Sequence, residues 1–461
     1  MPAARSSAAA ARPRALVATL LAALAGCSKG ASPPPHETGL EVAPPGPPPS
    51  AAVGPKLVPE VEAPKVRPPF NVLFILIDSL RWDMPWTGYE RPIAPWLDAF
   101  AKKSTLYPRG YSISSYTANS VAPALVGKYP SEMQRDGFFF TLWGPDNLFF
   151  GERAQKRGHR TLSGHGHGYF KPVMGLGQGF DDYRLLPGTE LDVKGVENVT
   201  SEALNKLAKT MLSVPKNVSQ ENGKRFFAYY HFLDPHYTYI PHKDHPDWGL
   251  DIRALYDNEV HYTDKWVGDL VDWAQKQPWG KDTAIVISAD HGEGFGERGR
   301  FRHAYDVWES LVRVPLIIHL PGAAPRRIEL PRSHIDLAPT FADLMGVPHD
   351  PPYRGKSLLP EVLGAQAELR PVVAELTRCD IMDRRRAVID DNWKIIELGD
   401  GVEWLLFDVV KDPKEENDLS KTDPERFTAM KELYDRLSAA IPNLPIPGLT
   451  PLKGAPSGQR W

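Results

Sequence analysis

Long apolar runs in the sequence stop at acidic residues. Residues 70–77 end at Asp78, and residues 283–287 come shortly before the pair Asp290 and His291. Continuous apolar runs of this length, rich in β-branched and aromatic residues, predict strands buried on both faces of a sheet. Because ligand sites of open α/β sheets lie at the carboxyl ends of the strands, these residues are candidates for chemistry.

Stretches with helical spacing of apolar residues alternate with these runs. The predicted helices cover residues 94–103, 118–126, 150–157, 201–212, 255–275 and 337–345, and further strands cover residues 160–162, 225–232 and 314–320. Alternation of strand and helix is typical of α/β proteins. We therefore expect a large, mostly parallel sheet with helices on both faces, over residues 70–370.

After about residue 371 the pattern changes to short strands. They are predicted over residues 372–375, 386–389, 393–396 and 404–407, followed by a helix over 424–437. Tight-turn sequences at residues 390–392 and 399–401 separate them. This predicts a C-terminal subdomain over 371–445, a small antiparallel sheet with one helix, and then a tail over 446–461.

The N-terminus has the features of an export signal. Arginines precede an apolar stretch over residues 15–24, which is too short to span a membrane comfortably. The stretch ends in Leu24-Ala25-Gly26-Cys27, which resembles a bacterial lipoprotein cleavage box. We expect a signal peptide over 1–27, acylation of Cys27, and a tether over 28–69 whose Pro/Ala/Gly content cannot build a core. The expected location is the bacterial cell envelope, periplasmic or outer-surface. An ordinary signal peptide with a chance cysteine is the alternative.

Composition narrows the class of protein. The 461 residues are 42% hydrophobic and 10% aromatic, which indicates a globular chain. The net charge is −3 with no long basic block in the folded part, which argues against nucleic acid as a partner. The two cysteines, Cys27 and Cys379, cannot form a disulfide framework, and Cys379 is expected to be a small structural residue.

The strand ends carry groups suited to a metal-assisted reaction. Asp78, Asp290 and His291 could hold a divalent cation, and Thr117 stands before a predicted helix, where free backbone N–H groups favour an anion. A hydroxyl nucleophile needs activation, which a cation can provide. Histidines across the site could then stabilise the substrate oxygens and protonate a leaving alcohol.

Taken together, these motifs resemble the sulfatase family within the alkaline-phosphatase-like superfamily. The resemblance runs in order from about residue 69 to about residue 440, through the segments 71–83, 94–98, 234–239, 288–297, 308–317, 334–340, 386–394 and 407–419, with His303 between the fourth and fifth. It implies Asp78, Asp290 and His291 as metal ligands and Thr117 as the nucleophile.

The resemblance also assigns roles around the substrate. His236 and His303 would contact the substrate anion or bind a second metal. The loop 164–168 falls at a family position that faces the substrate oxyanion, so His165 and His167 would bind substrate there, although a plain surface loop would have the same composition. Asn119 could donate to a substrate oxygen or equally satisfy the start of its helix.

Two departures from the family pattern bear on the chemistry. Sulfatases mature a Cys or Ser to formylglycine, whereas Thr117 has no oxidisable CH₂ group and the usual arginine partner is Val121. Ser79 replaces a second acid, which makes the site less calcium-like and favours one or two zinc or manganese ions, with calcium still an option.

These departures favour phosphate chemistry. The expected function is a metal-dependent hydrolase that cleaves a phosphate or sulfate ester through Thr117, with the phosphoester favoured and with a small-molecule, lipid or glycan substrate. A sulfuric ester hydrolase and a phosphoethanolamine- or glycerophosphate-type transferase are the enzymatic alternatives. A catalytically inactive, metal-binding lipoprotein is the alternative from a different class.

Overall fold

The computed structural model describes residues 68–187 and 200–446. The predicted signal peptide with Cys27, nearly all of the tether, and the tail beyond residue 446 lie outside these residues. Within the described residues, no helix combines the length and the apolar character that crossing a membrane requires.

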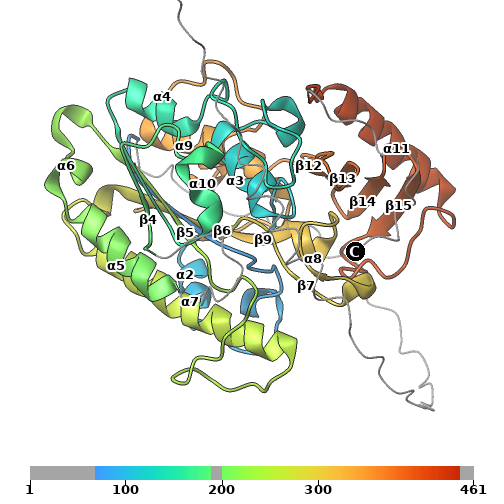
Figure 1. Cartoon of the computed structure of the whole chain (residues 1–461), viewed down its shortest axis with the longest axis horizontal. Helices are drawn as coiled ribbons and strands as arrows, with labels where there is room; N and C mark the ends of the chain where they lie inside the picture. The colour runs from blue at the N-terminus through green and yellow to red at the C-terminus, as the bar shows by residue number, and fades with distance from the viewer. Residues whose placement is uncertain (1–67, 188–199, 447–461) are drawn as a thin grey trace, which may run out of the picture. The chain divides into compact units, whose positions relative to one another are not determined.

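A nine-stranded sheet forms the centre of the described chain (Figure 1). Its strand order is β10-β2-β9-β6-β1-β5-β3-β4, with β11 also paired to β2. Among the described strands of this sheet, β9 alone runs antiparallel to its neighbours. The predicted mostly parallel sheet is thus confirmed. The strands are β1 (Asn71–Ile77), β2 (Thr105–Tyr111), β3 (Arg160–His165), β4 (Asp182–Leu185), β5 (Phe226–Phe232), β6 (Thr283–Ala289), β9 (Arg313–His319), β10 (Arg326–Arg327) and β11 (Arg332–Ser333).

Helices cover both faces of this sheet, because its central strands are apolar on both sides. Phe74 and Val286 pack on one face with residues of α3, α4 and α9, whereas Leu73 and Ile285 pack on the other with residues of α2, α5 and α7. Figure 1 shows the two groups of helices on opposite sides of the strands. The helices are α2 (Pro95–Ala101), α3 (Thr117–Val126), α4 (Phe150–Lys156), α5 (Ser201–Leu212), α6 (Pro215–Val218), α7 (Ile252–Gln275), α8 (Glu309–Val312), α9 (Leu337–Met345) and α10 (Leu359–Val362).

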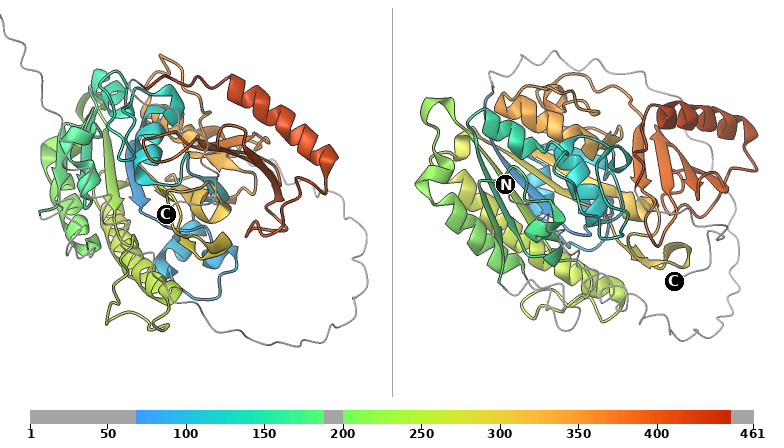
Figure 2. Two further views of the ribbon diagram at one scale, coloured as in Figure 1. Left: turned by 45° about the vertical axis from the view of Figure 1, so that its right-hand side comes forward. Right: turned by 45° about the horizontal axis from the view of Figure 1, so that its top comes forward.

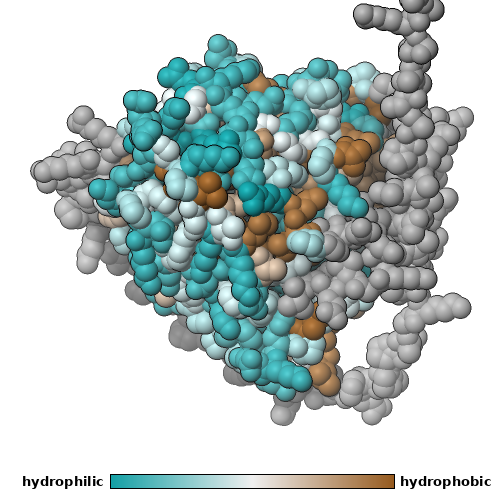
Figure 3. All heavy atoms as spheres, turned by 60° about the vertical axis from the view of Figure 1, so that its left-hand side comes forward, coloured by the Kyte–Doolittle hydropathy of each residue, from teal (hydrophilic) through white to brown (hydrophobic). Residues whose placement is uncertain are grey.

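The face that carries the β4 edge of the sheet and helices α5 and α6 is mainly hydrophilic, with small apolar patches (Figure 3). This distribution fits amphipathic helices whose apolar sides are turned to the sheet. Buried Leu204 and Met211 of α5, for example, belong to the apolar cluster beneath it.

The four-stranded antiparallel C-terminal sheet follows in chain order, β12 (Val372–Leu376), β13 (Arg385–Asp390), β14 (Trp393–Leu398) and β15 (Glu403–Asp408), with helix α11 (Pro424–Ala439). Its two faces have different partners. Val388 and Ile395 pack against Met430 of α11, whereas Ala387 and Ile396 join the core of the large sheet. Figure 2 shows α11, in red, lying along the outside of this sheet. The predicted sheet-and-helix arrangement is confirmed.

Two of the features that the sequence did not predict bear on the large sheet and on the site. Strand β2 contains Pro108 and Gly110, residues that normally argue against a strand interior, and the structure accommodates them with an irregularity in the pairing of β2 with β9 between Tyr107 and Gly110. The short hairpin β7 (Gly294–Phe295) and β8 (Phe301–Arg302) also lacks a strand-length apolar pattern. It is important because it connects Glu293 with His303.

Candidate active site

The candidate site lies where β1 and β6 end side by side. Ile77 pairs with Ala289 in the parallel register, so the next residues, Asp78 and Asp290, emerge together at the carboxyl edge of the sheet. His291 follows Asp290 directly. The sequence therefore predicted the meeting point correctly, because the carboxyl ends of neighbouring parallel strands share one edge.

Asp78, Asp290 and His291 form a group whose ligand atoms all lie within 4.8 Å of one another. His291 Nε2 is 3.4 Å from Asp78 Oδ1 and 3.5 Å from Asp290 Oδ2, and all three side chains are fully buried. Within the described chain, the only ion-pair contacts of the two carboxylates are with histidines. Burial and the neighbouring Asp290 carboxylate raise the pKa of Asp78 well above its ordinary value. Two buried carboxylates without a Lys or Arg partner fit a divalent cation.

Backbone interactions orient these donors. His291 Nδ1 donates to the carbonyl of Gly292 at 2.8 Å, which leaves the Nε2 lone pair for a metal. Ser79 has a positive φ of 58°, a conformation that non-glycine residues adopt rarely. In this conformation its N–H donates to Asp290 Oδ1 at 3.3 Å and its hydroxyl donates to Asp78 Oδ1 at 3.0 Å. Ser79 thus holds both carboxylates rather than adding a third.

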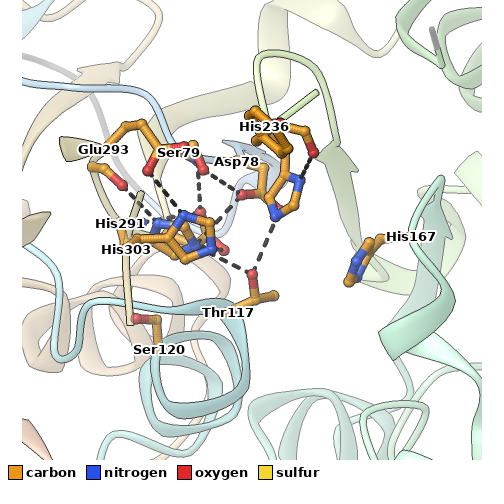
Figure 4. A network of polar contacts seen from close by, with 12 residues as sticks. Asp78, Ser79, Thr117, Ser120, His167, His236, His291, Glu293 and His303 are labelled. Carbon is orange, nitrogen blue, oxygen red and sulfur yellow. Dashed lines mark hydrogen bonds and ion pairs between the residues drawn. The ribbon is translucent and has the colours of Figure 1, made fainter. Parts of the chain in front are cut away.

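Thr117 faces this group from helix α3. It is the first residue of the 10-residue helix, with Tyr116 as the N-cap, so the predicted helix begins one residue earlier than expected. Thr117 Oγ1 lies 3.3 Å from His291 Nε2 and 3.5 Å from Asp78 Oδ2. The hydroxyl is therefore placed both against the candidate metal ligands and at the positive end of a helix (Figure 4).

His236 and His303 lie near the Thr117 hydroxyl and the candidate metal ligands (Figure 4). The ring of His303 lies 4.2 Å from that of His291 and 5.1 Å from that of His236, measured between centroids. His236 Nδ1 donates to the carbonyl of Tyr237 at 2.7 Å, so its Nε2 carries the lone pair. Burial lowers the pKa of His236 to about 3 and that of His303 to about 4, which keeps both rings neutral near pH 7.

Glu293 is a site residue to which the sequence had given no role. Its buried carboxylate accepts a hydrogen bond from His303 Nδ1 at 3.1 Å and another from the Tyr239 hydroxyl at 2.8 Å. His303 is flanked by Arg302 and Ala304, whose φ values are 68° and 76°. The β7–β8 hairpin thus fixes His303 against Glu293, an arrangement in which a carboxylate can orient a histidine side chain for chemistry.

The glycine-histidine loop places its two histidines differently. His165 ends β3, is fully buried, stacks on Phe170 at 3.9 Å and contacts Ser163 Oγ through Nε2 at 2.6 Å. His167 lies closer to the site, with its ring 5.8 Å from that of His236, although Figure 4 shows it standing apart from the other labelled side chains. His167 Nδ1 accepts the N–H of Tyr169 at 3.3 Å, so the neutral ring carries its proton on Nε2 and can donate to an anion.

Asn119 has a packing role in the structure. Its amide nitrogen donates to the hydroxyls of Tyr116 and Thr141, and its oxygen accepts from Thr377 at 2.8 Å. Both amide hydrogens are therefore used inside the protein, and none is left for a substrate oxygen. The reason is helical geometry. Residues two apart on a helix do not face the same side, so the Asn119 side chain points away from the side that Thr117 occupies.

Other acidic residues near the strand ends are structural. Asp234 accepts hydrogen bonds from the N–H groups of Thr200 and Ser201 at the start of α5, so it caps a helix. Arg81 binds Asp83 at 2.9 Å and Glu297 at 2.8 Å, which holds the loop after β1 in place. Cys379 is buried, and burial raises the pKa of its thiol to about 12.

Known proteins resemble the chain over nearly its whole described length. The family model described as Sulfatase matches residues 70–347, and a model described as N-sulphoglucosamine sulphohydrolase, C-terminal, matches residues 296–442. The choline-sulfatase of Rhizobium meliloti (strain 1021) is 24% identical over 446 residues, which cover 79% of this chain and 86% of that protein.

Solved structures share the fold. The complex of Ps i-CgsB with k-i-k-neocarrahexaose has a TM-score of 0.66 at 21% identity, covering 84% of this chain and 96% of its own. The phosphonate monoester hydrolase of Silicibacter pomeroyi has a TM-score of 0.62 at 20% identity, covering 80% of this chain and 95% of its own. The sequence relatives and structural neighbours therefore include a protein named as a sulfatase and one named as a phosphonate monoester hydrolase.

Proposed function

Because the chain belongs to the sulfatase family, it is a hydrolase of ester bonds, and we propose that Thr117 Oγ1 is its nucleophile. The position of this hydroxyl carries the proposal, since it lies 3.3 Å from His291 Nε2 and 3.5 Å from Asp78 Oδ2 at the first residue of α3. The positive end of that helix favours the oxygens of an incoming phosphate or sulfate group.

The residues that would hold a divalent metal are Asp78, Asp290 and His291, and their oxygen and imidazole donors suit zinc or manganese. A bound ion of this kind lowers the pKa of the Thr117 hydroxyl and screens the charge of the ester. Ser79 keeps both carboxylates oriented, and His167 Nε2–H donates to a nonbridging oxygen of the substrate.

The reaction is proposed in two displacements. Thr117 Oγ1 loses its proton and bonds to the central phosphorus or sulfur, while the bond to the leaving alcohol oxygen breaks. His303 moves the proton, because its Nδ1–H is fixed to Glu293 and its Nε2 is free to accept a proton and return it to the leaving oxygen. Water then cleaves the Thr117 ester, which restores the hydroxyl and releases the acid product.

A phosphoester is the favoured substrate. A formylglycine hydrate expels sulfate by collapsing to the aldehyde, whereas a threonine ester must wait for water, and threonine has no route to formylglycine. The structural likeness to a phosphonate monoester hydrolase supports phosphorus chemistry on this architecture.

A sulfate ester is the second candidate. It is supported by the choline-sulfatase relative and by a structural neighbour solved with D-glucosamine-2-N,6-O-disulfate as its substrate, at a TM-score of 0.64. The transferase alternative has no comparable support.

The test uses the purified protein and three chromogenic esters, 4-nitrophenyl phosphate, bis(4-nitrophenyl) phosphate and 4-nitrophenyl sulfate. We expect turnover of a phosphoester, loss of about 10³-fold or more in Thr117→Ala, and partial activity in Thr117→Ser. Acid quenching followed by peptide mass spectrometry should find a phosphate on the peptide that contains Thr117. Undiminished turnover by Thr117→Ala would refute the nucleophile, and turnover of the sulfate alone would select the second candidate.

The cellular location is also proposed. The segment before Cys27 supports a lipid-anchored protein of the bacterial envelope, acting on small-molecule, lipid or glycan esters near the membrane. Expression with a labelled fatty acid should label the wild-type chain but not Cys27→Ser. Equal labelling of both, or labelling of neither, would contradict the anchor.

A further inference from the structure

His231 lies directly beneath the two candidate metal carboxylates. In the parallel register, Leu76 of β1 pairs with His231 of β5 and with Ser288 of β6. Asp78 and Asp290 stand two residues beyond that level, and side chains two residues apart share one face of a sheet. His231, Asp78 and Asp290 therefore project from the same face of three adjacent strands, the face that α3 covers.

The histidine touches both carboxylates. His231 Nε2 lies 3.3 Å from Asp290 Oδ2 and 3.8 Å from Asp78 Oδ2, and the ring is fully buried. Its other nitrogen, Nδ1, is buried without a hydrogen-bond partner among the described residues. A buried N–H without an acceptor is more costly than a lone pair without a donor, so the ring proton belongs on Nε2, toward Asp290.

We propose that His231 is a positioning residue of the metal centre, whose Nε2–H donates to Asp290 Oδ2 and holds that carboxylate in its ligating orientation. The inference rests on the proposed metal-dependent function. His231 has the opposite tautomer to His291, whose Nδ1 donates to Gly292 O and whose Nε2 lone pair is free to bind the metal. His231 is accordingly a donor to a ligand rather than a ligand itself, and it stands beside the three-residue group that could hold the ion.

The role of His231 follows from the hydrogen bonds of Asp290. Asp290 Oδ1 accepts the N–H groups of Ser79 and His291, at 3.3 and 3.0 Å. With His231 on Oδ2, the carboxylate is held at both oxygens, and Oδ2 keeps a lone pair for the ion. Without His231, the hydrogen bonds from Ser79 and His291 would hold Oδ1 alone, and the carboxylate could rotate more freely. Partners of this kind, one step behind a metal ligand, commonly change metal affinity by about 10- to 100-fold.

The test measures metal affinity rather than activity. Zinc and manganese dissociation constants are determined by competition with a fluorescent chelator for the wild type, His231→Leu, His231→Gln and His165→Leu. His165 is the matched control because it pairs with His231 in the register of β3 and β5 and is equally buried, but it contacts Ser163 instead of a carboxylate. Thermal unfolding in EDTA reports the cost of each substitution to the metal-free fold.

We expect His231→Leu to weaken metal binding by about 10- to 100-fold, His165→Leu to change it less than about threefold, and His231→Gln to recover part of the loss because its amide can donate. If His231→Leu does not fold, the comparison between His231→Gln and His231→Asn replaces it, since the shorter amide cannot reach Asp290. Wild-type metal affinity in His231→Leu, or in His231→Asn, would overturn the inference about His231 but not the proposed metal centre. A wild-type protein that binds neither metal would overturn the proposed metal centre as well.

Discussion

Glu293 holds His303 through a 3.1 Å contact between Oε1 and Nδ1, and this contact determines which nitrogen of His303 faces the reaction. Glu293→Gln removes the negative charge while keeping the size of the side chain. We expect kcat to fall about 10²-fold, with a larger loss for esters of poorly acidic alcohols than for 4-nitrophenyl esters, because the proton supplied by His303 is more important there. Steady-state kinetics over a series of leaving groups checks this.

The metal content of Glu293→Gln serves as the control and should match the wild type, since Glu293 is not in the ligand group. An unchanged kcat with every leaving group would remove Glu293 from the mechanism.

Removal of the metal should destabilise the protein through Asp78 and Asp290. Without a cation the two buried carboxylates repel each other, so chelation should lower the melting temperature of the wild type. At a free metal concentration about a thousand times Kd, the lost stabilisation is about 4 kcal/mol. Asp290→Asn removes one of the two charges, so this variant should be inactive yet nearly insensitive to EDTA. Calorimetry with and without EDTA makes the comparison, and an equal EDTA shift in both proteins would argue against this metal site.

The buried ion pairs around Lys394 of β14 should make the free energy of unfolding depend on pH, because one of the partners is Glu415. Lys394 Nζ lies 3.1 Å from Glu309 and 2.9 Å from Glu415, and the Tyr111 hydroxyl also donates to Glu309. Burial raises the pKa of Glu415 to about 7, opposed by Lys394 and assisted by Glu309. A raised folded-state pKa means that the folded protein binds the proton more tightly than the unfolded chain does. Its contribution is complete below the ordinary pKa of 4.5 and is lost as the pH rises through 7.

We therefore expect the free energy of unfolding of the wild type to fall between pH 5 and pH 8 more steeply than that of Glu415→Gln. Urea denaturation at four pH values in this window measures the difference. Parallel pH dependences of the two proteins would contradict the assignment.

A second buried ion pair lies within the C-terminal sheet. Arg386 Nε donates to Glu375 Oε2 at 2.9 Å, and Oε1 of the same carboxylate accepts the N–H of Ser131 at 2.8 Å. Glu375→Ala leaves a buried guanidinium unpaired and should cost about 3–5 kcal/mol in the free energy of unfolding. The double variant Glu375→Leu with Arg386→Met should recover much of the loss. Additive losses in the double variant would show that the charge pairing is unimportant.

The sequence predicted the metal site because its residues are local to strand ends. Asp78 directly follows one apolar run, and the pair Asp290 and His291 comes shortly after another; parallel strands bring such positions to one edge. The same logic, applied at a helix start, led to the proposal of Thr117. These positions depend on the residues next to them in the chain, so the pattern of residue types was sufficient to predict where they lie.

The site residues to which the sequence gave no role, or a different one, depend on how distant segments pair in the fold. His231 lies inside an aromatic run that predicts core, and its importance appears only when the register places it beside Asp290. Glu293 needed the unpredicted β7–β8 hairpin to meet His303. His165 was assigned to the substrate from its loop position, yet it belongs to the buried end of β3.

The two faces of the C-terminal sheet have a consequence for how the chain can be divided. Ala387 and Ile396 belong to the core of the large sheet, while Val388 and Ile395 are covered by α11. A protein truncated at residue 370 would leave an apolar surface of the catalytic part open to water, and the isolated C-terminal piece would expose the matching strands. The change of pattern near residue 371 marks a change of topology. We nevertheless expect the two sheets to fold and unfold as one cooperative unit, so that neither part alone is well expressed or resistant to proteolysis.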